Sequence, residues 1–463
     1  MNIAEILADY VRFPSVSADP AFSQGVKDTA DFLARLLEKA GAQSEIVPTA
    51  GNPVVVGRFN AARADLPHIV IYGHYDVQPV DPLALWETPP FEPSVRDGRL
   101  FARGAADNKG PHAVAVAALA NLRERRPDLP LRLTFVFEGE EEIGSTHFRE
   151  FLDARVGELS TADFLLLSDT SSPSEDEVAI TIGLRGIVGL ELTVFGPNGD
   201  LHSGLHGGAV VNPIRALAEV CASLHAPDGS VAVPGFYDGA VAPAAWEREA
   251  FARFPQSEEA YKKEIGVDAL SRHPGYSALE SARYAPTLEF NGISGGYQGA
   301  GMKTIVPAEA SAKITCRLVP GQDPDAVFKK VSETILARLP AGVRAKIEKR
   351  QGCPAYFVCP PHRPNTPADM NPALARAFDA AEKIIAEKFG KPPIYAREGG
   401  SVGIVEDFRR AAGLDALMIG LFTADSRIHA PNESADLAML EKGVGVYEAI
   451  YEACAARGNA AAR

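Results

Sequence analysis

Apolar residues of the first 185 positions fall into two alternating patterns. Some segments repeat them at helical spacing, and others form short unbroken runs, which is typical of buried strands. Helices that alternate with buried strands usually cover a parallel sheet. The pattern therefore predicts an α/β fold, a mostly parallel sheet with helices on both faces. The predicted helices are residues 32–40, ending at Gly41, and 113–124, and the predicted strands are 53–59, 68–72, 131–137 and 163–167.

Near residue 186 the pattern changes to a few long β-rich runs and two amphipathic helices, which predicts an inserted α+β domain at residues 186–365. The α/β pattern then resumes, so residues 1–185 and 366–463 are predicted to form one domain. Residues 226–301, rich in Pro, Gly and aromatics, are predicted to be loops and short helices. The predicted elements are strands 186–195, 311–319, 343–349 and 414–421, and helices 212–225, 325–339, 371–390 and 435–457.

Side chains that bind metals or transfer protons follow directly after three predicted strands. In open α/β sheets, ligands bind outside the carboxyl ends of the strands, so these groups are predicted to share one edge. Carboxylates gathered there repel one another unless a positive charge lies between them, and a pair of divalent metal ions would supply it. The groups are His74 with Asp76, then Glu140, Glu141 and Glu142, then Asp169, joined by Asp107 and His429 from loops.

Each of these residues also has an ordinary structural interpretation. A lone His74 would more often be a core histidine, but Asp76 two residues on can fix its imidazole, which favours a metal ligand. Asp107 stands in a Gly-flanked loop where Asp is common in turns. Residues 140–142 could be a solvated acidic run, and their sequence does not distinguish ligand from base.

Composition narrows the class of partner and the compartment. Asp and Glu number 60 against 46 Lys and Arg, a net charge of −14, which disfavours nucleic acid and anionic lipid. No apolar run reaches the ~18 residues of a membrane span, and the N-terminus carries no signal-peptide pattern. Five cysteines without a C-x-x-C motif favour a reduced compartment, so we predict a cytoplasmic protein.

The chain resembles the M20 metallopeptidases, and within them the cytosolic dipeptidases of the carnosinase type. The matching segments follow one another in order over nearly the whole chain. They are Gly73-His74-Tyr75-Asp76-Val77-Gln78-Pro79, Trp86 with Pro90-Phe91-Glu92-Pro93, Arg103-Gly104, Asp107-Asn108-Lys109-Gly110, Glu141-Glu142-Ile143-Gly144-Ser145, Asp200-Leu201-His202-Ser203-Gly204, Arg317-Leu318-Val319-Pro320 and Arg397-Glu398-Gly399-Gly400-Ser401.

The resemblance implies two divalent ions, zinc or manganese, and a role for each residue of the cluster. Asp107 would bridge the metals, and its bond to Asn108 would be cis. Glu141 would be the general base and Asp76 would orient His74. Because Glu140 precedes the Glu-Glu pair, the assignment of base and ligand within residues 140–142 stays open by one residue. One metal would be held by His74 and Glu142, and the other by Asp169 and His429.

The inserted domain corresponds to the family's lid, which also mediates dimerisation. His202 would reach into the neighbouring subunit's site and donate a hydrogen bond to the developing oxyanion. Arg317, Ser401 and the backbone around Gly400 would bind the free carboxylate of a small peptide. Thr304 would also line the site.

The predicted function is hydrolysis of dipeptides or short peptides with a free C-terminal carboxylate, by a homodimeric enzyme of this type. One alternative is an N-acyl-amino-acid amidohydrolase with the same metals. Another is a non-catalytic, peptide-binding dimer, which is disfavoured because every ligand and the base are present in the sequence.

Overall fold

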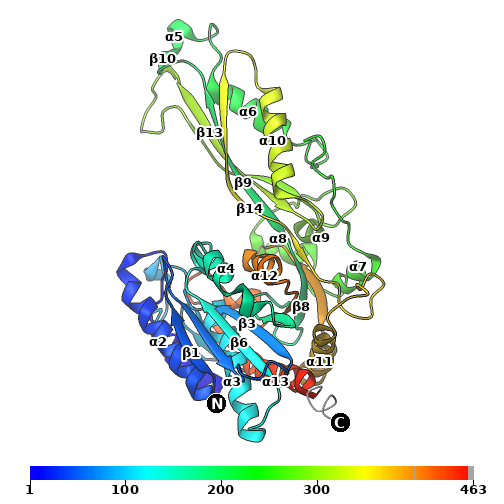
Figure 1. Ribbon diagram of the computed structural model, residues 1–463. Helices are drawn as coiled ribbons and strands as arrows, with labels where there is room; N and C mark the ends of the chain where they lie inside the picture. Colours follow the sequence, from blue (N-terminus) through cyan, green and yellow to red (C-terminus); the bar gives the residue numbers. More distant parts are fainter. Residues whose placement is uncertain (401, 457–463) are drawn as a thin grey trace.

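The computed structural model describes residues 1–400 and 402–456, which form two units, each built on its own sheet (Figure 1). The larger unit holds a nine-stranded sheet. Its strands are β1 (Gln43–Val47), β2 (Val54–Phe59), β3 (His68–His74), β6 (Arg132–Glu138), β7 (Phe164–Leu167), β8 (Ala179–Leu184), β15 (Tyr356–Phe357), β16 (Ile394–Glu398) and β17 (Ala416–Ile419).

The strand order in this sheet is β1-β2-β6-β3-β7-β17-β8-β15, with β16 beside β8. The central strands β6, β3, β7 and β17 run parallel to one another, and β16 runs parallel to β8. Antiparallel pairs occur toward the two edges. The predicted α/β class, with a mostly parallel central sheet, is therefore confirmed.

Helices cover both faces of this sheet, as the alternation of side chains along β3 shows. Tyr72 packs edge-on against Phe148 and Phe408 on one face. The next residue, Gly73, faces the other side, where a Cβ atom would come within 2.5 Å of the His112 side chain. The first face carries α4 (Phe148–Leu159) and α12 (Gly403–Ala412), and the second α1 (Ile3–Tyr10), α2 (Ser23–Ala40), α3 (Gly110–Arg125), α11 (Pro372–Phe389) and α13 (Leu437–Ala455).

The smaller unit has a four-stranded antiparallel sheet in the order β11-β13-β9-β14. Two helices cover one face of it, and together they enclose a core separate from that of the larger unit. The elements are β9 (Gly186–Phe195), β11 (Thr287–Gly295), β13 (Glu309–Leu318) and β14 (Arg344–Cys353), with α6 (Pro213–Ser223) and α10 (Pro324–Arg338).

One strand of this unit lies where we predicted loops and short helices. Three short helices are present between residues 226 and 301, but β11 follows them as an edge strand. The sequence did not predict this strand, because Asn291, Gly292 and Gly295 disfavour strands and a bulge interrupts the pairing between Phe290 and Gly292. The three helices are α7 (Ala245–Phe251), α8 (Glu258–Ile265) and α9 (Ala278–Tyr284).

Two short connections join the units. Arg185 alone separates β8 from β9, and residues 354–355 separate β14 from β15. The two connections pass at backbone contact, since a Cβ on Gly186 would lie 2.6 Å from the backbone nitrogen of Ala355. In the described part of the chain, no helix has the length and apolar character that crossing a bilayer requires.

Candidate metal centre

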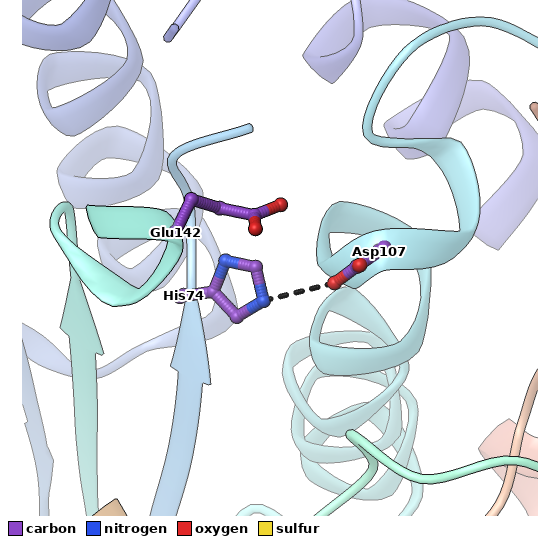
Figure 2. A group of neighbouring side chains, drawn as sticks. All are labelled: His74, Asp107 and Glu142. Carbon is purple, nitrogen blue, oxygen red and sulfur yellow. Dashed lines mark hydrogen bonds and ion pairs between the residues drawn. The ribbon is translucent and has the colours of Figure 1, made fainter. Parts of the chain in front are cut away.

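Three neighbouring strands bring the predicted site residues to one edge of the larger sheet. His74 is the last residue of β3, which lies between β6 and β7. Glu142 follows β6 in a short turn, and Asp169 follows β7 by two residues. Figure 2 shows the His74 ring facing Asp107, with Glu142 beside both. The carboxyl ends of these parallel strands therefore form the candidate site, as the strand pattern predicted.

Asp107 lies between two imidazoles. Its Oδ1 is 3.0 Å from Nε2 of His74, and its Oδ2 is 2.9 Å from Nε2 of His429. His429 comes from a loop more than 300 residues away in sequence, so only folding brings it here. A carboxylate with one oxygen toward each of two histidines has the geometry that a bridging metal ligand needs.

Glu142 and Asp169 flank these contacts on opposite sides. Oε2 of Glu142 is 3.4 Å from Nε2 of His429, and Oδ1 of Asp169 is 3.7 Å from Nε2 of His74. These contacts pair His74 with Asp169 and His429 with Glu142, the reverse of the pairing that the family resemblance suggested. The strand order places β3 between β6 and β7, so Glu142 and Asp169 lie on opposite sides of His74, and the His429 loop returns on the Glu142 side.

His74, Asp107 and Glu142 nevertheless remain close enough to hold one ion, since each offers a ligand atom and these atoms lie within 4.8 Å of one another. Imidazole nitrogen with carboxylate oxygen suits zinc or manganese. The donor set therefore fits divalent cations.

The pKa values of the cluster residues also indicate a site for cations. Burial, together with the negative charge of Asp107, raises the pKa of Glu142 to about 8. The hydrogen bond to Asp107 outweighs burial and raises the pKa of His429 to about 9. Burial favours neutral Asp107, yet hydrogen bonds from His429 and His74 hold its pKa well below the usual range. Protons on Glu142 and His429 thus offset the negative charge of the neighbouring carboxylates. A bound metal cation would replace these protons.

The three acids of residues 140–142 occupy three distinguishable positions. Glu140 is turned away from the cluster, because its carboxylate accepts hydrogen bonds from the backbone N–H groups of Asn52 and His147, at 3.0 and 3.1 Å. Glu142 belongs to the donor set. Glu141 lies between them and is partly exposed, and desolvation together with the negative charges of Asp169 and Asp107 raises its pKa to about 7.

Asp76 contacts both His74 and the acidic turn, which is formed by residues 140–142. His74 Nδ1 is 3.1 Å from the Asp76 backbone oxygen and 3.4 Å from Oδ1 of its carboxylate. The same carboxylate accepts hydrogen bonds from the backbone N–H groups of Glu141 and Glu142, at 3.2 and 3.1 Å. Its contacts support the orienting role that we predicted, and they add a second contact, to the acidic turn, that the sequence did not suggest.

Asn108 was missed as a supporting residue. The Asp107–Asn108 peptide bond is cis, as the resemblance implied. The Asn108 amide donates hydrogen bonds to Oδ1 of Asp169 at 2.8 Å and to the backbone oxygen of Ser168 at 2.7 Å. It therefore links Asp107 to Asp169, and the Asp-Asn sequence was the only available signal.

Glu433 was also missed, although it is fully buried directly behind the Asp107 loop. Its carboxylate accepts hydrogen bonds from the backbone N–H groups of Asp107, at 3.0 Å, and of Ala106 and Gly104, both at 2.9 Å. Arg103 adds an ion pair of 2.8 Å. The spacing His429-x-x-x-Glu433 was a possible signal. Glu433 thus fixes the backbone that carries Asp107.

We expect Glu433→Gln to weaken metal binding by about 10- to 100-fold, because the amide cannot accept all four hydrogen bonds and Asp107 loses its fixed position. Metal titration of the stripped protein measures this directly. Glu219→Gln, an exposed glutamate on α6, is the matched control. Unchanged affinity in Glu433→Gln would mean that the loop is held without this carboxylate.

The residues predicted to contact substrate lie in two other places. Arg317, half-buried on β13, lies close to the connection between the units, opposite Ile187 of β9. Gly400 lies near it, since its carbonyl accepts a hydrogen bond from the Arg185 backbone N–H at 3.1 Å. Ser401 falls outside the described residues.

His202 and Thr304 lie together, far from the cluster. His202 ends β10 (Leu201–His202), which pairs with β12 (Ile305–Val306) at the end of the smaller unit remote from the larger sheet (Figure 1). The Thr304 carbonyl accepts a hydrogen bond from the Ser203 N–H at 3.0 Å. Thr304 is therefore a neighbour of His202, and the two share one location rather than lying beside Arg317.

Comparison with known proteins agrees with this geometry. The model of Peptidase family M20/M25/M40 matches residues 70–453. The chain belongs to this peptidase family. It is therefore an enzyme of the metallopeptidase class, as the motifs predicted.

Two relatives cover most of the chain. It is 29% identical to the Cys-Gly metallodipeptidase dug1 of Schizosaccharomyces pombe, over 95% of this chain and 93% of the relative. It is 28% identical to the Beta-Ala-His dipeptidase of Homo sapiens, over 83% and 74% respectively. Among solved structures, the M20 family metallo-carboxypeptidase Sso-CP2 from Sulfolobus solfataricus superposes with a TM-score of 0.84 at 28% identity, covering 98% of this chain and 100% of that one.

Proposed function

We propose that this M20 peptidase is a cytoplasmic di-metal dipeptidase that cleaves dipeptides or short peptides with a free C-terminal carboxylate. The observation that carries the proposal is Asp107, held between the imidazoles of His74 and His429. The names of the two relatives favour dipeptides as substrates. The five cysteines are all free thiols, which suits a reducing compartment.

Two divalent ions, zinc or manganese, fit the donor set, with Asp107 shared between them. His74 and Asp169 would hold one ion, and Glu142 and His429 the other, following the contacts in this structure. Bound metals would polarise the carbonyl of the peptide bond and make a bound water acidic enough to react near neutral pH.

Glu141 is proposed as the general base. It lies beside the donor set, and its carboxylate makes none of the contacts that mark Glu142 as a ligand. A carboxyl group with a pKa of about 7 is matched to proton transfer near neutral pH. It would take the proton of the attacking water and return it to the leaving amine.

Arg317 and the turn at Gly399 and Gly400 are proposed to bind the substrate carboxylate. A guanidinium binds a carboxylate through two parallel hydrogen bonds. Arg317 belongs to the smaller unit, whereas the metal ligands belong to the larger one. The smaller unit would therefore act as a lid that brings Arg317 to the site and excludes water on closing.

The remote position of His202 supports the proposal that it acts in a neighbouring subunit. Exposed apolar side chains gather around it, with Leu205 at 77% and Met302 at 97% exposure. Such a patch at one end of a domain is typical of a protein interface. We propose that this end of the lid forms a homodimer, placing His202 where it can donate a hydrogen bond to the oxyanion of the other site.

Mixing two inactive variants tests this arrangement. His202→Ala and Glu141→Gln homodimers should each be nearly inactive. Random reassortment gives heterodimers that contain one complete site, so the mixture should recover about a quarter of wild-type activity. Sedimentation confirms the dimer in each sample. If His202 acted within its own chain, mixing would restore no activity.

A substrate panel separates dipeptidase from N-acyl-amino-acid amidohydrolase activity. We expect the metal-loaded enzyme to hydrolyse Cys-Gly or β-Ala-His with a higher kcat/KM than any N-acetyl amino acid. Product amines are measured by a colorimetric assay, with the metal-stripped enzyme as control. Faster turnover of N-acetyl amino acids would favour the amidohydrolase, and no turnover of either class would favour a binding protein.

A further inference from the structure

A cavity of about 460 Å³ lies under the smaller sheet, on the face that α6 and α10 leave open. Cys316 and Leu318 point into the core beneath those helices. Because side chains alternate along a strand, Thr287 and Arg317 point to the opposite face, where they line the cavity. The other wall is formed by α8, α9 and the segment between them, including Tyr261, Ile265, Leu270 and Arg272.

Positive charge dominates the described residues that line this cavity. They include three arginines, Arg185, Arg272 and Arg317, but only one carboxylate, Glu289. Burial and the neighbouring charge of Arg317 lower the pKa of Arg185 to about 10, and both arginines line the same cavity. A concave site lined by like charges concentrates ions of the opposite sign.

The cavity begins where the substrate carboxylate is proposed to bind. Arg317 lies in its wall. Arg185 lines it as well, and its Nε donates a hydrogen bond to the Gly399 carbonyl at 2.7 Å. A substrate held by its carboxylate at Arg317 would have the side chain of that same residue next to the cavity. The volume falls within the range of small-molecule sites, so charge rather than size would select the ligand.

We propose that this cavity receives the side chain of the residue on the C-terminal side of the cleaved bond, and that it selects a side chain bearing a carboxylate, as in aspartate or glutamate. This inference rests on the proposed peptidase function and specifies its substrate class. Arg272 would be the specificity residue, because it lies on the wall opposite Arg317. Glu289 would oppose selection, since it repels the same carboxylate.

The test compares dipeptides that differ only in a C-terminal Glu or Gln. The ratio of their kcat/KM values is the readout, because effects common to both substrates cancel. A charge-assisted hydrogen bond is expected to favour Glu by about tenfold, and the preference should shrink as salt is added. Arg272→Gln should reduce the ratio, whereas Glu289→Gln should increase it. Arg215→Gln, an exposed arginine on α6, should leave the ratio unchanged.

Calorimetry with free glutamate and free glutamine keeps the test independent of turnover. Metal-loaded wild-type protein should bind glutamate more tightly, by about tenfold, and Arg272→Gln should lose most of that difference. If no dipeptide is hydrolysed but this difference is present, the peptidase proposal fails and the acid-selective cavity stands. Equal affinities for the two amino acids, or a preference that Arg272→Gln and Glu289→Gln leave unaltered, would overturn the cavity proposal.

Discussion

Glu141→Gln is expected to lower kcat by about 10²- to 10⁴-fold, the usual contribution of a general base. The amide keeps the size of the side chain but cannot accept the proton of the attacking water. Its metal content should stay near that of the wild type, because the donor atoms belong to other residues. Steady-state kinetics with the best dipeptide, together with elemental analysis, measure both quantities.

Glu140→Gln is the matched control from the same acidic turn. Glu140 is held by Asn52 and His147, and the amide oxygen of glutamine can still accept one of their hydrogen bonds. This variant should therefore keep its kcat within about tenfold of the wild type, with its main effect on stability. A large loss of kcat in Glu140→Gln and none in Glu141→Gln would identify Glu140, and not Glu141, as the general base.

Removing the metals is expected to abolish turnover and to destabilise the fold. When the free metal concentration is a hundred times the Kd of a site, binding of that metal stabilises the fold by about 2.7 kcal/mol, and removing the metal loses this stabilisation. Unfolding of the stripped and reloaded protein in denaturant measures this difference. Zinc and manganese added separately show which ion restores activity. Full activity in protein free of divalent ions would contradict the proposed mechanism.

Metal binding should also release protons near pH 7. In the metal-free chain, the pKa of His429 is raised to about 9 and that of Glu142 to about 8, so both groups carry protons at pH 7. A metal binds only the deprotonated forms. Affinity should therefore rise by up to about tenfold per pH unit for each proton displaced, and level off above both pKa values.

Calorimetric titrations in two buffers with different ionisation enthalpies count the released protons. The observed heat should differ between the buffers at pH 7 and converge as the pH approaches 10. Identical heats in the two buffers at pH 7 would show that these groups are already deprotonated, or that they do not ligate the metal.

Five of the nine strands of the larger sheet could be predicted from the sequence, because their apolar runs are strong, whereas β1, β8, β15 and β16 were not predicted. The helix through residues 32–40 ends at Gly41, whose φ of 90° is the left-handed conformation that glycine adopts readily. The runs 68–72 and 131–137 are strands that extend to His74 and Glu138. Strand β11 was missed, because an exposed edge strand with two glycines shows little apolar alternation.

Within the site, the sequence determined which residue types are present and that three groups follow strands, since an apolar run followed by acids is visible without coordinates. Only the tertiary structure decided their partners. The strand order β6-β3-β7 and the return of the His429 loop set the pairing of His74 with Asp169 and of His429 with Glu142. Hydrogen bonds to Asn52 and His147 removed Glu140 from the cluster. These outcomes depend on contacts between segments far apart in sequence, and local patterns carry no information about such contacts.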